Sequence, residues 1–165
     1  MTESAGTWQI IRADYSNAAH ARAIVELLDE YASGPSGGGE PLPKQVKAEL
    51  IPALQRTPCA LTLLAFADET PIGLLNAFET LSTFRAKPLL NIHDIAVTAS
   101  WRRRGVARAL MLELENLARE RGCCKLTLEV LENNVSAQAL YRELGFEGYQ
   151  LQESFGKALF WQKSL

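Results

Sequence analysis

Three consecutive arginines stand directly before a glycine in the stretch VTASWRRRGVARAL, residues Val97 to Leu110. An extended apolar run precedes them, and a helical pattern of apolar positions begins at Val106. A helix N-terminus carries unpaired backbone N–H groups and a positive partial charge, which together attract anions. Gly105 and Ala107 have no side chain large enough to cover these N–H groups, and Gly105 can also adopt a positive φ. The stretch therefore predicts a phosphate-binding turn between a strand and a helix.

The size and composition are those of one ordinary globular domain. The chain has 165 residues, of which 47% are apolar and 22% charged, so we expect a single domain over residues 1–165. The net charge of −2 predicts no general attraction to nucleic acid or to a membrane. Residues 1–80 hold five Lys/Arg against ten Asp/Glu, and residues 81–165 hold twelve against nine. This asymmetry suits a site that receives a cation on one side and an anion on the other, or it is a chance fluctuation of surface charge.

The cysteines and the start of the chain favour a reducing, cytoplasmic location. Cys59 and the adjacent pair Cys123 and Cys124 are odd in number and form no spaced framework, so no disulfide scaffold is expected. The pair lacks the spacer of a zinc-ligand pair, and we expect no metal. No signal-peptide pattern and no apolar run of membrane-spanning length is present.

The front of the chain predicts one strand and two helices. The strand is TWQIIRA, a helix capped by Ser16 or Asn17 follows, and a second helix covers about Lys44 to Gln55, which Pro52 should bend or interrupt. Residues 32–43 hold four glycines and three prolines and predict a mobile loop. This loop is either a lid over a substrate or a plain connector.

The rest of the chain predicts mainly strands. These elements are expected in order: strands at 59–67, 72–83 and 88–97, a helix at 106–121, a strand at 125–131, a helix from Asn134 or Ser136 to Leu144, and two short strands in EGYQL (147–151) and ALFWQK (158–163). The connection through the long helix is a right-handed crossover, so the strands that flank it should be parallel. A central mixed sheet with helices on both faces follows.

The arginine turn also resembles a signature of the GNAT acetyltransferase superfamily. RRRGVA (102–107) is similar to the family's Arg/Gln-x-x-Gly-x-Gly/Ala motif, NIHDIAVTASW (91–101) to its fourth strand, and KLTLEVLENNVSAQALYRELGF (125–146) to its fifth strand and Asn-x-x-Ala-x-x-Leu-Tyr segment. The family often has proline near Ala99 and tyrosine or phenylalanine at Trp101. The resemblance covers roughly residues 88–146. It implies an α/β fold with a mixed, mostly antiparallel sheet of six to seven strands, a splayed parallel pair formed by strands four and five, and four helices on both faces.

The resemblance implies an N-acetyltransferase with acetyl-CoA as co-substrate. The expected reaction is direct transfer to a primary amine of a small molecule in a ternary complex. The alternatives are a peptide N-terminus or protein lysine as acceptor, a non-catalytic CoA-binding sensor, or a nucleic-acid-binding domain. Against the last, the helix after the arginines continues to Glu113, Glu115 and Glu120. The apolar stretch ALFWQ (158–162) is compatible with a homodimer interface or with part of the sheet.

The resemblance also implies the contacts to the cofactor. The expected residues are Ile95, Ala96, Val97, Arg102, Arg103, Arg104, Gly105, Val106, Ala107, Asn134, Ala137 and Tyr141. The backbone of Ile95 and Val97 would pair with pantetheine beside a bulge near His93 or Asp94. The N–H of Ile95 would stabilise the developing oxyanion. Asn134 is alternatively only a helix N-cap.

Two proton-transfer roles complete the predicted site. Tyr141 occupies the family's position for the acid that protonates the leaving thiolate, and a phenol with a reference pKa of about 10 suits a thiolate whose thiol has a pKa of about 8.5. The candidates for the base that deprotonates the amine are Glu79, His93, Asp94 and Glu129. Strand alternation predicts that His93 and Asp94 point to opposite faces, so that at most one faces the acceptor. The residues alone leave this choice open.

Overall fold

The computed structural model describes residues 7–149 and 159–164. These residues group into two compact units, one within residues 1–129 and the other within residues 130–165. The first unit contains the whole sheet and the first three α-helices, and the second contains the last α-helix. Each unit is described by itself.

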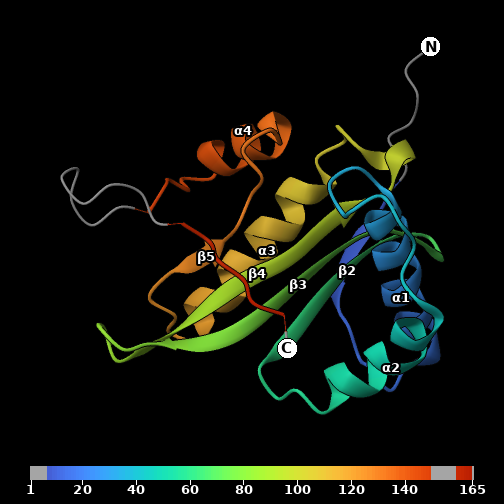
Figure 1. Cartoon of the computed structure of the whole chain (residues 1–165), viewed down its shortest axis with the longest axis horizontal. Coiled ribbons are helices and arrows are strands. Elements are labelled where there is room, and N and C mark those ends of the chain that lie inside the picture. Colours follow the sequence, from blue (N-terminus) through green and yellow to red (C-terminus); the bar gives the residue numbers. More distant parts are fainter. Residues whose placement is uncertain (1–6, 150–158, 165) are drawn as a thin grey trace. The chain divides into compact units, whose positions relative to one another are not determined.

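The first unit is built on a five-stranded sheet (Figure 1). Its strands, which follow one another across the sheet in chain order, are β1 (Gln9–Arg12), β2 (Ala60–Ala67), β3 (Thr70–Ser82), β4 (Lys87–Val97) and β5 (Leu126–Leu128). Neighbouring strands are antiparallel except for β4 and β5, which are parallel. The predicted mixed sheet and its parallel pair are thereby confirmed, although β5 is shorter than the predicted 125–131.

The predicted count of six to seven strands is wrong for the described residues, which form five. Residues 147–149 of EGYQL and 159–163 of ALFWQK lie outside any strand, and the remaining parts of both segments fall outside the described residues. The side chains of Leu159, Phe160 and Trp161 are 74–83% exposed. An apolar run becomes a strand only where a neighbouring strand pairs with it and covers a face, and these side chains lack such cover.

Helices cover both faces of the sheet, as predicted. They are α1 (Ala18–Ser33), α2 (Lys44–Gln55) and α3 (Val106–Glu120), and a 3₁₀ turn, η1 (Ala99–Trp101), precedes α3. The side chain of Asn17 caps α1 by accepting from the N–H groups of Ala19 and His20. Pro52 does not interrupt α2, which continues to Gln55. Only one intrahelical bond is lost to this proline, and it lies in the last turn, where the helix is about to end.

Alternation along β3 separates the two faces. Leu74 packs with Ile24, Leu27 and other apolar residues of α1 and α2. Its neighbour Gly73 faces α3, since a Cβ built there would lie 3.2 Å from Cγ1 of Val106. Successive side chains of a strand point to opposite faces, so α1 and α2 cover one face and α3 the other. We call these the α1 face and the α3 face.

The glycine-rich connection between α1 and α2 is irregular, as predicted, and hydrogen bonds fold it back onto α1. The N–H of Gly39 donates to the carbonyl of Ala32, and the N–H of Leu42 donates to Oδ1 of Asp29 at 2.8 Å. The other carboxylate oxygen of Asp29 accepts from Nζ of Lys47 at 2.6 Å. One carboxylate therefore ties the loop to both helices.

Candidate active site

β4 and β5 stop pairing in the middle of β4. Their register runs only from Leu90 opposite Leu126 to Ile92 opposite Leu128, whereas β4 continues to Val97. Five residues of β4 therefore extend beyond its last pairing with β5. The parallel pair is confirmed, and its splaying beyond Ile92 stays a prediction, because β5 itself ends at Leu128.

Backbone groups on this unpaired edge of β4 point away from β3. The N–H of Thr98 donates to the carbonyl of Ile72 at 3.0 Å, so it points toward β3. Backbone direction alternates along a strand, and the N–H groups of Val97 and Ile95 therefore point to the opposite side. Ala96 differs, because its N–H points toward β3 and its methyl packs against the α1-face core. Of the predicted cofactor contacts on β4, Ile95 and Val97 have the orientation that pairing with an extended ligand requires.

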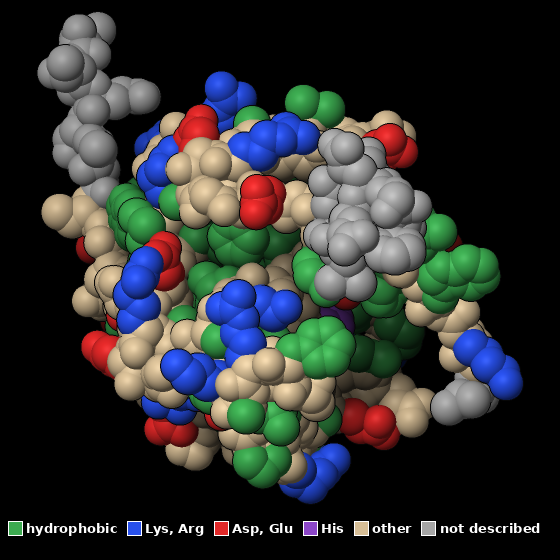
Figure 2. Space-filling view, turned by 90° about the vertical axis from the view of Figure 1, so that its left-hand side faces the viewer, with side chains coloured by type: hydrophobic (Ala, Val, Ile, Leu, Met, Phe, Trp, Pro, Cys, Tyr) green, Lys and Arg blue, Asp and Glu red, His purple; other side chains and the backbone are tan. Residues whose placement is uncertain are grey.

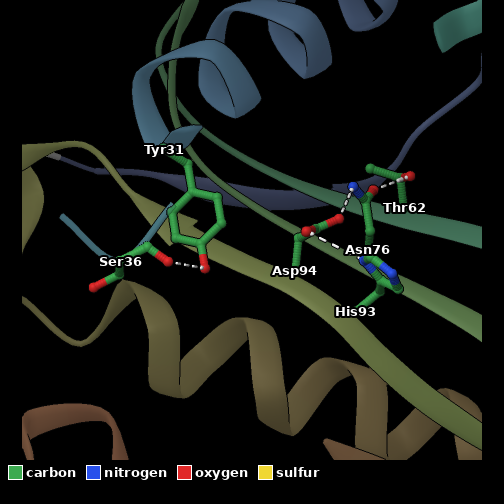
Figure 3. Close-up of polar contacts among 6 residues, drawn as sticks. All are labelled: Tyr31, Ser36, Thr62, Asn76, His93 and Asp94. Atoms are coloured by element: carbon green, nitrogen blue, oxygen red, sulfur yellow. Dashed lines mark hydrogen bonds and ion pairs between the residues drawn. The ribbon is translucent and has the colours of Figure 1, made fainter. Parts of the chain in front are cut away.

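β4 contains a bulge at the predicted place. Asp94 pairs with Asn76 of β3 and Ile92 pairs with Ala77, so His93 is an extra residue with no partner of its own. Nδ1 of His93 lies 3.3 Å from Oδ1 of Asp94 (Figure 3). The prediction that these two side chains point to opposite faces is therefore wrong. Strict alternation holds only in a regular strand, and the bulge brings the two side chains together.

The arginine turn links the end of β4 to α3. Arg102 is extended and donates from Nε to the carbonyl of Val97 at 3.1 Å. Arg103 has a φ of +61° and Gly105 a φ of +85°. The guanidinium of Arg104 lies 5.2 Å from the ring centroid of Trp101, which is a cation–π contact. All three arginines are exposed.

The N-terminus of α3 has no side-chain cap. Gly105 is its N-cap residue and has no side chain to accept from the first N–H groups, in contrast to the asparagine at the start of α1. Val106 is 1% exposed, so its side chain belongs to the core and only its backbone can face the turn. No protein atom lies within 4 Å of the position that a Cβ of Gly105 would take. Uncapped N–H groups, three arginines and a glycine without close neighbours fit the pyrophosphate of a coenzyme.

On the face that Figure 2 shows, the basic side chains of the described residues do not form one continuous surface. In Figure 2, Lys and Arg side chains (blue) on the face shown lie among acidic and apolar side chains. Helix α3 also carries an ion pair between Arg119 and Glu115. This mixture suits a local anion site better than an extended nucleic-acid surface.

A polar row crosses the α1 face, and sequence reasoning did not find it. Thr62 of β2 donates from Oγ1 to Oδ1 of Asn76 at 2.6 Å, and Nδ2 of Asn76 donates to Oδ2 of Asp94 at 3.0 Å (Figure 3). Thr62 and Asn76 are 1% and 3% exposed and are the two fully buried polar residues among those described. A signal was present, since Thr62 interrupts the apolar strand ALTLLAFA and Asn76 interrupts the apolar run PIGLLNAF. The signal can be interpreted only with the strand register, which places Thr62 opposite Asn76.

Tyr31 is a further residue that the sequence did not indicate. It lies near the end of α1, and its hydroxyl donates to the carbonyl of Ser36 at 3.4 Å, close to Asp94 in Figure 3. Burial raises the pKa of Tyr31, and the negative charge of Asp94 raises it further. The pKa of Tyr31 thus depends on the charge of the Asp94 carboxylate beside the bulge.

Of the other candidate bases, Glu79 and Glu129, the first lies on the opposite face of the sheet from the bulge residues. Glu79 shares the parity of Gly73 and therefore the α3 face, where its Oε2 accepts from Nη1 of Arg121 at 2.9 Å. Asp94 pairs across strands with Asn76 on the α1 face. Glu129 is exposed and follows the last residue of β5. The structure therefore brings together His93 and Asp94 and leaves Glu79 on the other face of the sheet, whereas a role of Glu129 as base stays a prediction.

The second unit holds the remaining predicted residues on α4 (Val135–Glu143). Asn134 is the N-cap of this helix, and its Oδ1 accepts from the N–H of Ala137 at 3.3 Å. Its interpretation as a cap is thus confirmed, whereas its contact with a cofactor stays a prediction. Tyr141 is 8% exposed, and its ring lies 6.0 Å from the ring of Phe146.

The described residues support neither a nucleophilic cysteine nor a metal site. Burial raises the pKa of Cys123, with the charge of Glu79 as a second cause, which disfavours the nucleophilic thiolate. No group of three or more His, Cys, Asp or Glu side chains that could hold a metal ion occurs among residues 7–149 and 159–164. None of the helices in this part of the chain is long and apolar enough to cross a bilayer.

The chain belongs to the acetyltransferase (GNAT) family, whose sequence pattern matches residues 21–146. It is 31% identical over 103 residues to an aminoglycoside N(6')-acetyltransferase type 1 of Acinetobacter haemolyticus. The aligned residues make up 61% of this chain and 71% of the relative. It is 28% identical over 128 residues to a thialysine N-epsilon-acetyltransferase of Caenorhabditis elegans, which covers 74% of each chain. The protein is therefore an acyltransferase of the acetyltransferase class.

Solved structures share the fold. One is AAC(6')-Iy in complex with the bisubstrate analogue CoA-S-monomethyl-acetylneamine, with a TM-score of 0.74 and 20% identity, covering 96% of this chain and 99% of that one. At this identity the likeness concerns the fold alone. It extends over nearly the whole chain, and the GNAT architecture is confirmed.

Proposed function

We propose that this acetyltransferase moves an acetyl group from acetyl-CoA to a primary amine of a small molecule, by direct transfer while both substrates are bound. One observation carries the proposal. β4 runs from its last pairing with β5, at Ile92, along an unpaired edge and into a turn with three exposed arginines and an uncapped helix N-terminus. An extended pantetheine arm that ends in a pyrophosphate suits an edge followed by an anion site.

On the cofactor side, the turn would bind charge and the strand would bind the arm. Arg102, Arg103 and Arg104, with the first N–H groups of α3 at Val106 and Ala107, would hold the pyrophosphate. The backbone of Ile95 and Val97 would pair with the pantetheine arm, and the N–H of Ile95 would polarise the thioester carbonyl. When bound, acetyl-CoA supplies the electrophilic acyl carbon.

On the acceptor side, we assign proton removal to His93 with the help of Asp94. If Nδ1 of His93 donates to Asp94, Nε2 keeps a lone pair that can take a proton from the ammonium, directly or through water. The side chain of His93 is 67% exposed, so an acceptor can reach it. The 3.3 Å separation is long, as is common for catalytic hydrogen bonds before substrates bind.

We assign the proton for the departing thiolate to the hydroxyl of Tyr141. The support is its place in the Asn-x-x-Ala-x-x-Leu-Tyr segment of the family pattern, which spans residues 134–141. Asn134 and Ala137 would contact the cofactor from the same segment. We take the whole chain as one acetyltransferase domain, because the family match extends across both compact units.

The substrate class follows from the named relatives and from the charge at the bulge. Aminoglycosides and thialysine are small cationic amines, and the carboxylate of Asp94 would attract such a cation. A peptide N-terminus or a protein lysine presents the same charge, so the choice between these acceptors is an outcome of the test.

The test begins with isothermal titration of acetyl-CoA into the protein. We expect micromolar binding that is lost in an Arg104→Glu, Gly105→Glu double variant, with thermal unfolding as the check that the variant is folded. Aminoglycosides, thialysine and a short peptide are then offered as acceptors. Acetylated product is followed by mass spectrometry, because the exposed Cys59 would react in a thiol assay.

Each outcome has a clear meaning. Acetylation of a small amine supports the proposal, and acetylation of the peptide alone moves the acceptor to proteins. Cofactor binding without transfer to any acceptor would indicate a CoA-binding sensor. Absence of acetyl-CoA binding would overturn the proposal, and the arginine turn would then be tested against nucleic acid.

A further inference from the structure

Four side chains form a continuous row of hydrogen bonds under α1. The hydroxyl of Tyr15 lies 3.0 Å from Oγ1 of Thr62, Thr62 donates to Oδ1 of Asn76 at 2.6 Å, and Nδ2 of Asn76 donates to Oδ2 of Asp94 at 3.0 Å. Three of these residues occupy directly opposed positions on β2, β3 and β4. The register of the sheet, rather than local sequence, brings them together.

Elimination fixes the direction of every bond. An ionised Asp94 can only accept, so the amide nitrogen of Asn76 faces it and the amide oxygen faces Thr62. The single proton of the Thr62 hydroxyl is then used toward Asn76, and Thr62 must accept from Tyr15. All the donors therefore point one way, from Tyr15 to Asp94. Bonds aligned in this way polarise one another in a medium of low dielectric constant.

The row ends beside the proposed base. Asn76 engages Oδ2 of Asp94, and Oδ1 lies 3.3 Å from Nδ1 of His93. We propose that Asn76 and Thr62 are positioning residues: they hold the Asp94 carboxylate so that Oδ1 keeps the proton of neutral His93 on Nδ1 and leaves Nε2 free for the acceptor amine. This inference rests on the proposed function for its catalytic consequence.

The fold does not itself require polar residues at these two positions. Leu64 and Leu74 on the same face of β2 and β3 are fully buried apolar side chains. A buried pair that is replaced on both sides by apolar groups of similar shape is close to neutral for stability. Thr62 and Asn76 satisfy each other, and beyond themselves they bond the hydroxyl of Tyr15 at one end of the row and the carboxylate next to the bulge at the other.

The first arm of the test reads the histidine tautomer by ¹⁵N NMR at a pH where histidine is neutral. The chain has two histidines. His20 accepts at Nδ1 from the N–H of Asp14 at 3.1 Å, so its proton is on Nε2 and it serves as an internal reference. We expect His93 to show the opposite tautomer, with the proton on Nδ1. In a Thr62→Val, Asn76→Leu double variant, we expect a mixture of both tautomers at His93 and no change at His20.

The second arm measures steady-state kinetics with the acceptor amine. The double variant should lower kcat by roughly 10-fold to 100-fold, which is the loss typical of a misplaced catalytic group. The Kd for acetyl-CoA should stay unchanged, because the arginine turn is untouched. A single Thr62→Ser variant keeps both the hydroxyl and Asn76. Its His93 tautomer and its kcat should therefore be those of the wild type.

A matched control comes from another asparagine–threonine pair. Nδ2 of Asn91 on β4 donates to Oγ1 of Thr127 on β5 at 3.0 Å. An Asn91→Leu, Thr127→Val variant removes the same chemistry from the same strand without touching Asp94. It should leave the His93 tautomer and kcat as they are in the wild type.

The two arms separate the possible failures. An unchanged His93 tautomer in a folded Thr62→Val, Asn76→Leu variant overturns the positioning role, and so does an unchanged kcat. If the wild-type protein acetylates no amine, the proposed function fails, and the tautomer arm still decides whether the row positions Asp94.

Discussion

Arg103 and Gly105 both have left-handed φ angles, +61° and +85°, on either side of Arg104 in the turn before α3. A glycine adopts this conformation without penalty, whereas a non-glycine residue there costs roughly 1–2 kcal/mol. The side chain of Arg103 is exposed, so its strain is not offset by burial in the core. Such strain is characteristic of ligand-binding turns.

This strain makes Arg103→Gly an informative substitution. Relief of the left-handed strain and the greater freedom of glycine in the unfolded chain should nearly cancel, so the free energy of unfolding should change by less than about 1 kcal/mol. The affinity for acetyl-CoA should fall severalfold, because one charge is lost from the pyrophosphate site. Urea unfolding and isothermal titration measure the two quantities. Undiminished affinity would remove Arg103 from the list of cofactor contacts.

Two glycines near the turn should respond differently to alanine. At Gly105, the φ of +85° predicts a loss of about 1 kcal/mol and weaker acetyl-CoA binding, without a clash inside the protein. At Gly73, a Cβ would lie 3.1 Å from the carbonyl oxygen of Ala96 and 3.2 Å from Cγ1 of Val106. Overpacking there should cost about 1–3 kcal/mol. Thermal unfolding of Gly105→Ala and Gly73→Ala gives the comparison, and a smaller loss for Gly73→Ala than for Gly105→Ala would contradict this assignment of causes.

Substitution of the candidate bases should separate the two faces of the sheet. We expect His93→Ala to lower kcat by roughly 10²-fold to 10⁴-fold, the range for loss of a general base. Glu79→Gln should leave kcat unchanged and lower the free energy of unfolding by at most about 1 kcal/mol, since its ion pair with Arg121 is partly exposed. The acceptor kinetics of both variants are the measurement. A loss confined to Glu79→Gln would transfer the role of base to the α3 face.

Local patterns were sufficient for much of this fold. A helix start signal predicts the arginine turn, and hydrophobic periodicity predicts the order of the elements. The handedness of crossover connections predicts the parallel pair. The bulge at His93 came from the family resemblance, because nothing in NIHDIAV itself breaks the pattern of a strand. Its consequence, the contact between His93 and Asp94, was missed because alternation was applied across the bulge.

The rest of the site depends on register and on distant partners. Thr62, Asn76 and Asp94 are separated by 14 and 18 positions in the chain, and only the pairing of three strands aligns them. The same holds for Glu79, whose partner Arg121 lies 42 positions away. A single sequence does not show how the strands pair. It can therefore identify polar residues in apolar strands, but it does not show which of them are in contact.

The last prediction concerns Tyr31 and Asp94 at alkaline pH. Burial is the main cause of the raised pKa of Tyr31, and the charge of Asp94 is the second. Asp94→Asn removes the second cause and leaves the first. The pKa of Tyr31 should therefore fall in this variant and still remain above its ordinary value of about 10. Tyrosinate absorbance is the measurement, with the contribution of Tyr31 obtained as the difference from a matched Tyr31→Phe variant in each background.

The same shift fixes the sign of the effect on stability. A tyrosine whose pKa is raised in the folded state contributes stability that is fully present below pH 10 and is lost as the pH rises through the folded pKa. Tyr31 thus contributes to a decline of the free energy of unfolding above about pH 10. That part of the decline should be smaller in Asp94→Asn and absent in Tyr31→Phe. An equal decline in the wild type and Asp94→Asn, with a smaller one in Tyr31→Phe, would show that the charge of Asp94 does not reach Tyr31.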